Sequence, residues 1–159
     1  MALKFTLPDG SVREYPPGTT GLEIAEGIGA RLAKAAVAVT VDGAQYDVFR
    51  PLDAGGAFSV ITDSTEEGRH VLRHSAAHVM AQAVLDLFEG ATFGIGPPIT
   101  DGFYYDFDIG RPFTPDDLTA IEDRIAEIIS EDQPFVREDI TAEVGRDMFT
   151  DHPFKLEII

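Results

Sequence analysis

The residues best suited to chemistry are three histidines spaced four positions apart, His70, His74 and His78. Four residues are just over one turn of an α-helix, so the three imidazoles would lie along one face of a helix. Imidazole titrates near neutral pH and is the commonest metal ligand in proteins. A pair at i and i+4 could grip one metal ion or one reacting group. Such pairs are more often surface histidines or a hydrogen-bonded core pair, so the spacing alone leaves these alternatives open.

A helix over about Gly68–Glu89 is predicted to carry these histidines. Its apolar residues recur at helical spacing and predict a buried face, with the histidines at its edge. The members of this predicted face are Leu72, Ala76, Met80 with its neighbour Val79, Ala83, and Leu87 with its neighbours Val84 and Phe88. His70 lies among charged residues and is expected to be solvated, whereas small residues separate His74 from His78 and leave space above them.

Composition limits the classes of function. The chain has 159 residues, with 12 Lys and Arg against 28 Asp and Glu, which gives a net charge of −16. Such a charge repels a phosphate backbone, so any contact with nucleic acid must be local or made by protein outside these 159 residues. There is no Cys, and hence no disulfide or thiolate site. This composition, with no signal-peptide pattern and no apolar membrane span, predicts a cytoplasmic protein.

Residues 1–63 are predicted to form a small mixed α/β unit. The segment Leu3–Tyr15 alternates around Pro8-Asp9-Gly10 as a β-hairpin does. Thr20 and Glu23 have the spacing of a capping box at the start of a short helix, which Gly27 and Gly29 weaken. Further strands are expected at Val37–Val41, Gln45–Val48 and Phe58–Thr62. This order of elements is typical of a β-grasp, ubiquitin-like fold.

A polar stretch, residues 64–69, is predicted to link this unit to a second one over residues 70–159. Beyond the histidine helix, Phe103, Tyr105 and Phe107 alternate with polar neighbours and predict one strand with two unlike faces. Thr114 is expected to cap an amphipathic helix that continues to about Ser130. The remaining elements are predicted as a strand at Phe135–Ile140, a short helix at Thr141–Phe149 and a strand at Phe154–Ile159. Because the last strand would end with the chain, we expect a truncated domain.

Two groups of motifs carry a resemblance to a known family. Residues 2–63, with LPDGSVREY, are similar to a TGS domain, a ubiquitin-like module of several nucleotide- and tRNA-related enzymes. The motifs RHSAAH (Arg73–His78) and IGPPITDGFYYDFD (Ile95–Asp108) resemble the editing domain of bacterial threonyl-tRNA synthetases. The resemblance implies an α+β fold: a β-grasp TGS domain at 1–63, then the N-terminal part of an HxxxH-type editing domain at 70–159.

The resemblance also implies a reaction and residues for it. In this family the editing site hydrolyses serine wrongly attached to the threonine tRNA. By matching positions, His74 and His78 are the histidines of the first editing motif. Tyr105 is the second tyrosine of GFYYD, and Lys155 matches the family's catalytic lysine less securely. The family's second motif, CxxxH, is absent from these 159 residues.

Cofactors and partners follow from the same resemblance. No metal and no cofactor is expected in this region, whereas the full-length enzyme would use ATP, Mg²⁺ and a Zn²⁺ of its catalytic core to charge tRNA with threonine. Its partner would be the acceptor end of the threonine tRNA, it would not bind a membrane, and it would form a homodimer through that core. Two alternatives remain open: a non-catalytic module that binds tRNA or protein, and a metal hydrolase whose histidines form half of a site.

Overall fold

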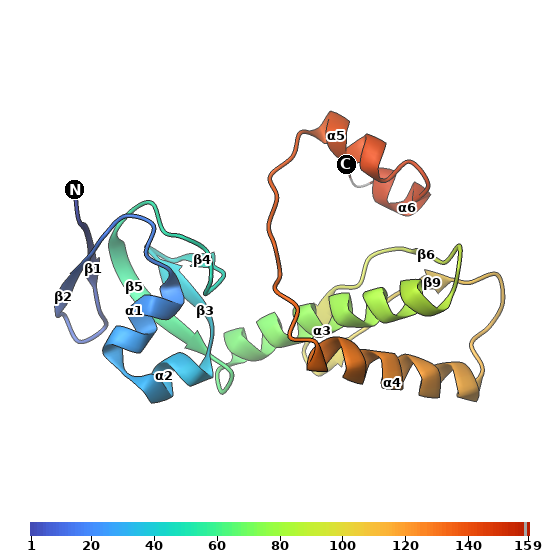
Figure 1. Cartoon of the computed structure of the whole chain (residues 1–159), viewed down its shortest axis with the longest axis horizontal. Helices are drawn as coiled ribbons and strands as arrows, with labels where there is room; N and C mark the ends of the chain where they lie inside the picture. Colours follow the sequence, from blue (N-terminus) through green and yellow to red (C-terminus); the bar gives the residue numbers. More distant parts are fainter. Residues whose placement is uncertain (158) are drawn as a thin grey trace. The chain divides into compact units, whose positions relative to one another are not determined.

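The computed structural model describes residues 1–157 and 159. Two compact units make up the chain, Met1–Leu72 and Arg73–Ile159. Their elements appear in chain order in Figure 1. Among the described residues, no helix is long and apolar enough to cross a membrane.

The first unit is a five-stranded β-grasp-like sheet with two helices. Its elements are β1 (Leu3–Thr6), β2 (Val12–Tyr15), α1 (Gly21–Ile28), α2 (Ala30–Ala35), β3 (Ala36–Val41), β4 (Ala44–Tyr46) and β5 (Gly56–Thr62). The strand order is β2-β1-β5-β3-β4, with β1 and β5 parallel and the other neighbours antiparallel. The predicted mixed α+β class and the β-grasp arrangement of this unit are thereby confirmed.

Local signals in the first unit act as the sequence predicts. Thr20 accepts a hydrogen bond from the backbone N–H of Glu23 at 3.2 Å, and the Glu23 carboxylate accepts one from the Thr20 N–H at 2.7 Å. The helix packs on the sheet through Ile24, which shares one buried cluster with Phe5 and Val39. One element was not predicted: the chain is extended at Gly29 and then enters the six-residue helix α2.

The second unit is built around two long helices. The histidine helix, α3, spans Glu66–Leu87, beginning two residues before the predicted start, and α4 spans Pro115–Ser130. They lie side by side (Figure 1) and share one apolar cluster. The other elements are β6 (Thr92–Phe93), β7 (Pro98–Ile99), β8 (Gly102–Phe103), β9 (Phe107–Asp108), α5 (Ala142–Met148) and α6 (Pro153–Leu156). Strand β6 pairs with β9 and β7 pairs with β8, both antiparallel.

The predicted buried face of α3 is confirmed only in part, since Ala83 and Val84 are buried in the cluster shared with α4. Leu72 and Leu87 are 45% and 41% exposed, and Ala76 is also exposed. Ala77, which was not assigned to this face, is buried. Apolar residues occur on several sides of this helix, so its periodicity did not determine which side α4 covers.

The single strand predicted through residues 103–107 is also wrong. Its two ends, β8 and β9, pair in separate two-stranded ladders, and residues 104–106 between them have no regular structure. The partner segments β6 and β7 are themselves separated by a turn-forming stretch that ends in Pro97. Since proline has no N–H to donate to a ladder, continuous pairing is interrupted there.

Two predicted strands near the end of the chain are absent. Residues 135–140 have no regular secondary structure, and Phe135 and Val136 are 61% and 86% exposed. No strand within residues 1–157 and 159 pairs with them, so their backbone has no sheet edge to join. The segment predicted as strand 154–159 instead contains α6, because Pro153 presets the first helical position. The part of that prediction at residue 158 lies outside the described residues.

Candidate functional site

The two histidines of the HxxxH motif contact each other directly. Nε2 of His74 and Nε2 of His78 lie 3.0 Å apart, and the ring centroids are 4.8 Å apart. One nitrogen must donate the proton and the other accept it, so at least one ring in this pair is neutral. Both side chains remain exposed, which leaves them accessible to water or a ligand. The four-residue spacing on one helix brings the two rings to the same side of α3.

His78 is held toward its neutral, basic form. Partial burial lowers the pKa of His78 below its ordinary value of 6.5, and the nearby charges of His74 and Lys155 lower it further. A neutral imidazole at neutral pH can accept a proton from water, which is what a general base must do. Lys155, on α6, is thus one of the positive charges that act on His78.

Lys155 projects from α6 over an aromatic ring. Its Nζ lies 4.7 Å from the centroid of Phe93, in strand β6. Burial lowers the pKa of Lys155 from its ordinary value, because desolvation penalises the ammonium form. A partly desolvated ammonium is well suited to stabilise negative charge that develops on a substrate oxygen.

Tyr105 is enclosed by other rings. It stacks on Phe107 with centroids 5.0 Å apart and meets Phe93 edge-on at 5.9 Å. Burial raises the pKa of the Tyr105 phenol, so its hydroxyl stays protonated and can donate a hydrogen bond. Gly96 gives the ring its space: a Cβ placed on Gly96 would lie 2.1 Å from the ring carbon Cδ2 of Tyr105.

Two of the four predicted site residues, Lys155 and Tyr105, meet at the ring of Phe93, which was not predicted, and the other two, His74 and His78, contact each other. Lys155 also acts on His78 electrostatically. Phe93 carries no sequence signal of its own beyond being apolar.

His152, which is distant from the motif histidines in the sequence, also reaches this ring. Its centroid lies 5.4 Å from that of Phe93, and its Nδ1 is buried without a hydrogen-bond partner in the described part of the chain. Within that same part, no group of three or more His, Cys, Asp or Glu side chains is arranged to hold a metal ion.

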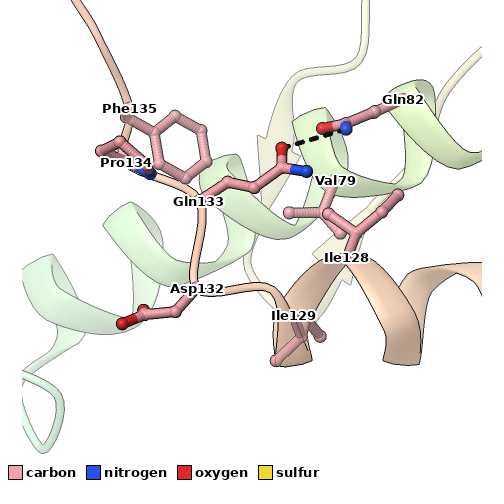
Figure 2. A pocket seen from close by; sticks show the side chains of 8 residues that line it. All are labelled: Val79, Gln82, Ile128, Ile129, Asp132, Gln133, Pro134 and Phe135. Carbon is pink, nitrogen blue, oxygen red and sulfur yellow. Dashed lines mark hydrogen bonds between the residues drawn. The ribbon is translucent and has the colours of Figure 1, made fainter.

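A separate cavity of about 260 Å³ lies between α3, α4 and the loop after α4. Figure 2 shows its wall of Val79 and Ile128, and the 3.1 Å hydrogen bond that joins Gln82 to Gln133. Its lining contains one carboxylate, Asp132, but no histidine, lysine or tyrosine. It therefore lacks the base and the cation that the histidine site offers.

Comparison with known proteins first identifies the class of the first unit. Residues 3–62, most of the first unit, match the family model of the TGS domain.

Over most of its length the chain is also similar to threonine–tRNA ligases. It is 51% identical to the one from Maricaulis maris, over 86% of this chain and 21% of the relative. It is 48% identical to that of Desulforamulus reducens, over 99% of this chain and 25% of the relative. The chain thus spans about a quarter or less of the curated relatives it matches. The resemblance to bacterial threonyl-tRNA synthetases is confirmed.

Proposed function

We propose that this chain is the editing region of a threonine–tRNA ligase, which hydrolyses serine wrongly esterified to the threonine tRNA. Residues 1–63 would be its TGS domain, residues 64–69 the link, and residues 70–159 part of the editing domain. The longer protein would be a cytoplasmic homodimer that charges tRNA with threonine using ATP. The observation that carries the proposal is the direct contact between His74 and His78, 3.0 Å apart, with the positive charge of Lys155 acting on His78.

The similarity of serine to threonine explains why such a hydrolytic site would be needed. Serine lacks one methyl group of threonine, and one methylene or methyl contact supplies only roughly 1–3 kcal/mol of discrimination. A second site that destroys the wrong product increases selectivity beyond what the first pocket can reach.

The reaction assigns a role to each side chain. Water attacks the ester carbonyl while neutral His78, oriented by His74, accepts one of its protons. The ammonium of Lys155 stabilises the negative charge on the carbonyl oxygen of the tetrahedral intermediate. When the intermediate collapses, the bond to the ribose oxygen breaks and the imidazolium returns its proton to that oxygen. Tyr105 donates a hydrogen bond that orients the water. The products are serine and a tRNA with a free ribose hydroxyl.

The test uses a chimera in which this chain replaces the matching region of the Desulforamulus reducens relative. We expect His74→Ala and His78→Ala to slow seryl-tRNA hydrolysis by roughly 10²- to 10⁴-fold, the usual contribution of a general acid or base. Threonine charging should stay almost unchanged, which also shows that the chimera is folded. His70→Ala is the matched control, since it is an exposed histidine of the same helix outside the motif.

The result against the proposal is equally specific. If all three histidine variants lower stability alike and none selectively slows hydrolysis, the histidines are structural. If the unmodified chimera charges threonine but hydrolyses no seryl-tRNA, the chain is better described as a TGS-containing binding module.

A further inference from the structure

Phe93 contacts three side chains that can carry charge or a proton. Its ring centroid lies 4.7 Å from the Nζ of Lys155, 5.4 Å from the ring of His152 and 5.9 Å from the ring of Tyr105. These three residues come from two different parts of the sequence, and Phe93 is the side chain that all of them touch.

The backbone of Phe93 is fixed independently of these contacts. Phe93 is paired with Phe107 in the β6–β9 ladder. The next residue, Gly94, donates its N–H to the carbonyl oxygen of Asp106 at 2.9 Å. The β6–β9 ladder therefore fixes the backbone that carries the ring, and side chains that pack against the ring are positioned by it.

Lys155, in contrast, has little else to hold its ammonium. Within residues 1–157 and 159 its Nζ forms no hydrogen bond or ion pair, whereas Lys4 pairs with Glu14 at 3.1 Å. It stands on α6, a helix of four residues that contacts β6. A free lysine side chain samples many rotamers. The face of an aromatic ring within about 6 Å attracts the ammonium and favours the rotamers that place it over the ring.

We propose that Phe93 is a positioning residue, whose ring face holds the ammonium of Lys155 against the same ring that Tyr105 meets. The inference rests on the proposed function for its effect on catalysis, but the placement of Lys155 can be tested without any reaction. An exposed cation–π contact biases an equilibrium by roughly 2- to 5-fold, so we expect effects of this size rather than a complete loss.

The first experiment is nuclear magnetic resonance of the 159-residue chain with labelled lysine. The sequence has three lysines, so Lys4 and Lys34 serve as internal references. A lysine over a ring face has its ε-methylene protons shifted upfield by the ring current. We expect this shift for Lys155 alone, its loss in Phe93→Leu and its retention in Phe93→Tyr.

A matched control exists in the same unit. Phe88 packs edge-on against Phe113 at 5.7 Å and has the Arg111 guanidinium 5.8 Å from its centroid. Phe88→Leu therefore removes a comparable ring and cation–π contact away from Lys155, and should leave the Lys155 shift unchanged. If the Lys155 signals of the unmodified chain coincide with those of Lys4 and Lys34, the inference is overturned, whether or not any variant folds.

The second experiment measures seryl-tRNA hydrolysis in the chimera. Phe93→Leu should lower kcat about 2- to 5-fold with little change in KM, and Phe93→Tyr should restore it. Adding Phe93→Leu to Lys155→Ala should slow the reaction no further, because the ring acts through the lysine. Additive effects would contradict the positioning role. If the Lys155 shift behaves as expected but no protein hydrolyses seryl-tRNA, the proposed function fails and the placement of Lys155 by Phe93 stands.

Discussion

Gly96→Ala is a sharp test of how Tyr105 is positioned. The added Cβ would lie 2.1, 2.3 and 2.6 Å from Cδ2, Cε2 and Cγ of the ring. Carbon atoms in favourable contact are about 3.5 Å apart, so the ring or the backbone would have to retreat by roughly 1.4 Å. The ring cannot do so freely, because it stacks on Phe107 at 5.0 Å and meets Phe93 at 5.9 Å.

The magnitude follows from this crowding. Forcing an extra methyl into a packed site costs about 1–3 kcal/mol, which lowers the folding equilibrium constant of the second unit by roughly 5- to 140-fold. Amide hydrogen exchange in α3 and α4 measures this loss for the second unit separately from the first. In the chimera, seryl-tRNA hydrolysis should fall as well, because the displaced phenol no longer orients the water.

Gly94→Ala is the control, two residues earlier in the same loop. Its added Cβ would lie 3.7 Å from the nearest atom, Cβ of Asp106, which is ordinary contact. The N–H that binds Asp106 is retained. We expect the amide hydrogen exchange and the seryl-tRNA hydrolysis of this variant to be nearly those of the unmodified protein. Equal effects of the two alanines would refute the close approach of Gly96 to Tyr105. The close approach would also be refuted if Gly96→Ala cost the same stability in a chain in which Tyr105 is already replaced by alanine.

Three further predictions concern charge and capping. Because the pKa of His78 is lowered in the folded state, the unfolded chain binds the proton more readily. The melting temperature of the second unit should therefore fall as pH drops below 6.5 through the folded pKa. In an imidazole titration followed by nuclear magnetic resonance, Lys155→Met should raise the pKa of His78, because it removes a positive neighbour. Thr114→Ala should cost about 1 kcal/mol by removing the cap of α4, measured by denaturant titration, whereas Thr119→Ala, which loses only a hydroxyl bond to a carbonyl of the same helix, should cost less. Arg124→Met should lower the melting temperature, since it removes ion pairs to three carboxylates, and the difference should shrink in 1 M salt.

Local signals in the sequence predicted local structure well. The capping box at Thr20 and the N-cap at Thr114 form as expected, because each needs only residues within one helical turn, and Thr114 also forms a capping box with Asp117 that was not predicted. The contact between His74 and His78 is of the same kind, since helical spacing alone brings residues four apart together. None of these features depends on what the rest of the chain does.

Features that depend on distant partners were not predictable from pattern. The segment 135–140 was predicted as a strand, but it has no strand to pair with in the described chain. The closeness of Gly96 to Tyr105 depends on how two short ladders fold the segment between them. Tyr105 and Lys155 were identified through resemblance to a family, and nothing in their own spacing indicated that both would contact Phe93.

The candidate site joins parts of unequal rigidity, and this decides how its variants should combine. The histidine pair stands on a helix of 22 residues, so its geometry is set by one continuous element. Lys155 stands on a helix of four residues and relies on the ring of Phe93, which also touches Tyr105. Gly96→Ala moves Tyr105, and Phe93→Leu removes a neighbour of the same ring, so the two changes share a partner. Their effects on hydrolysis should therefore be coupled, whereas Gly96→Ala and Arg124→Met, which share no contact, should act on stability additively.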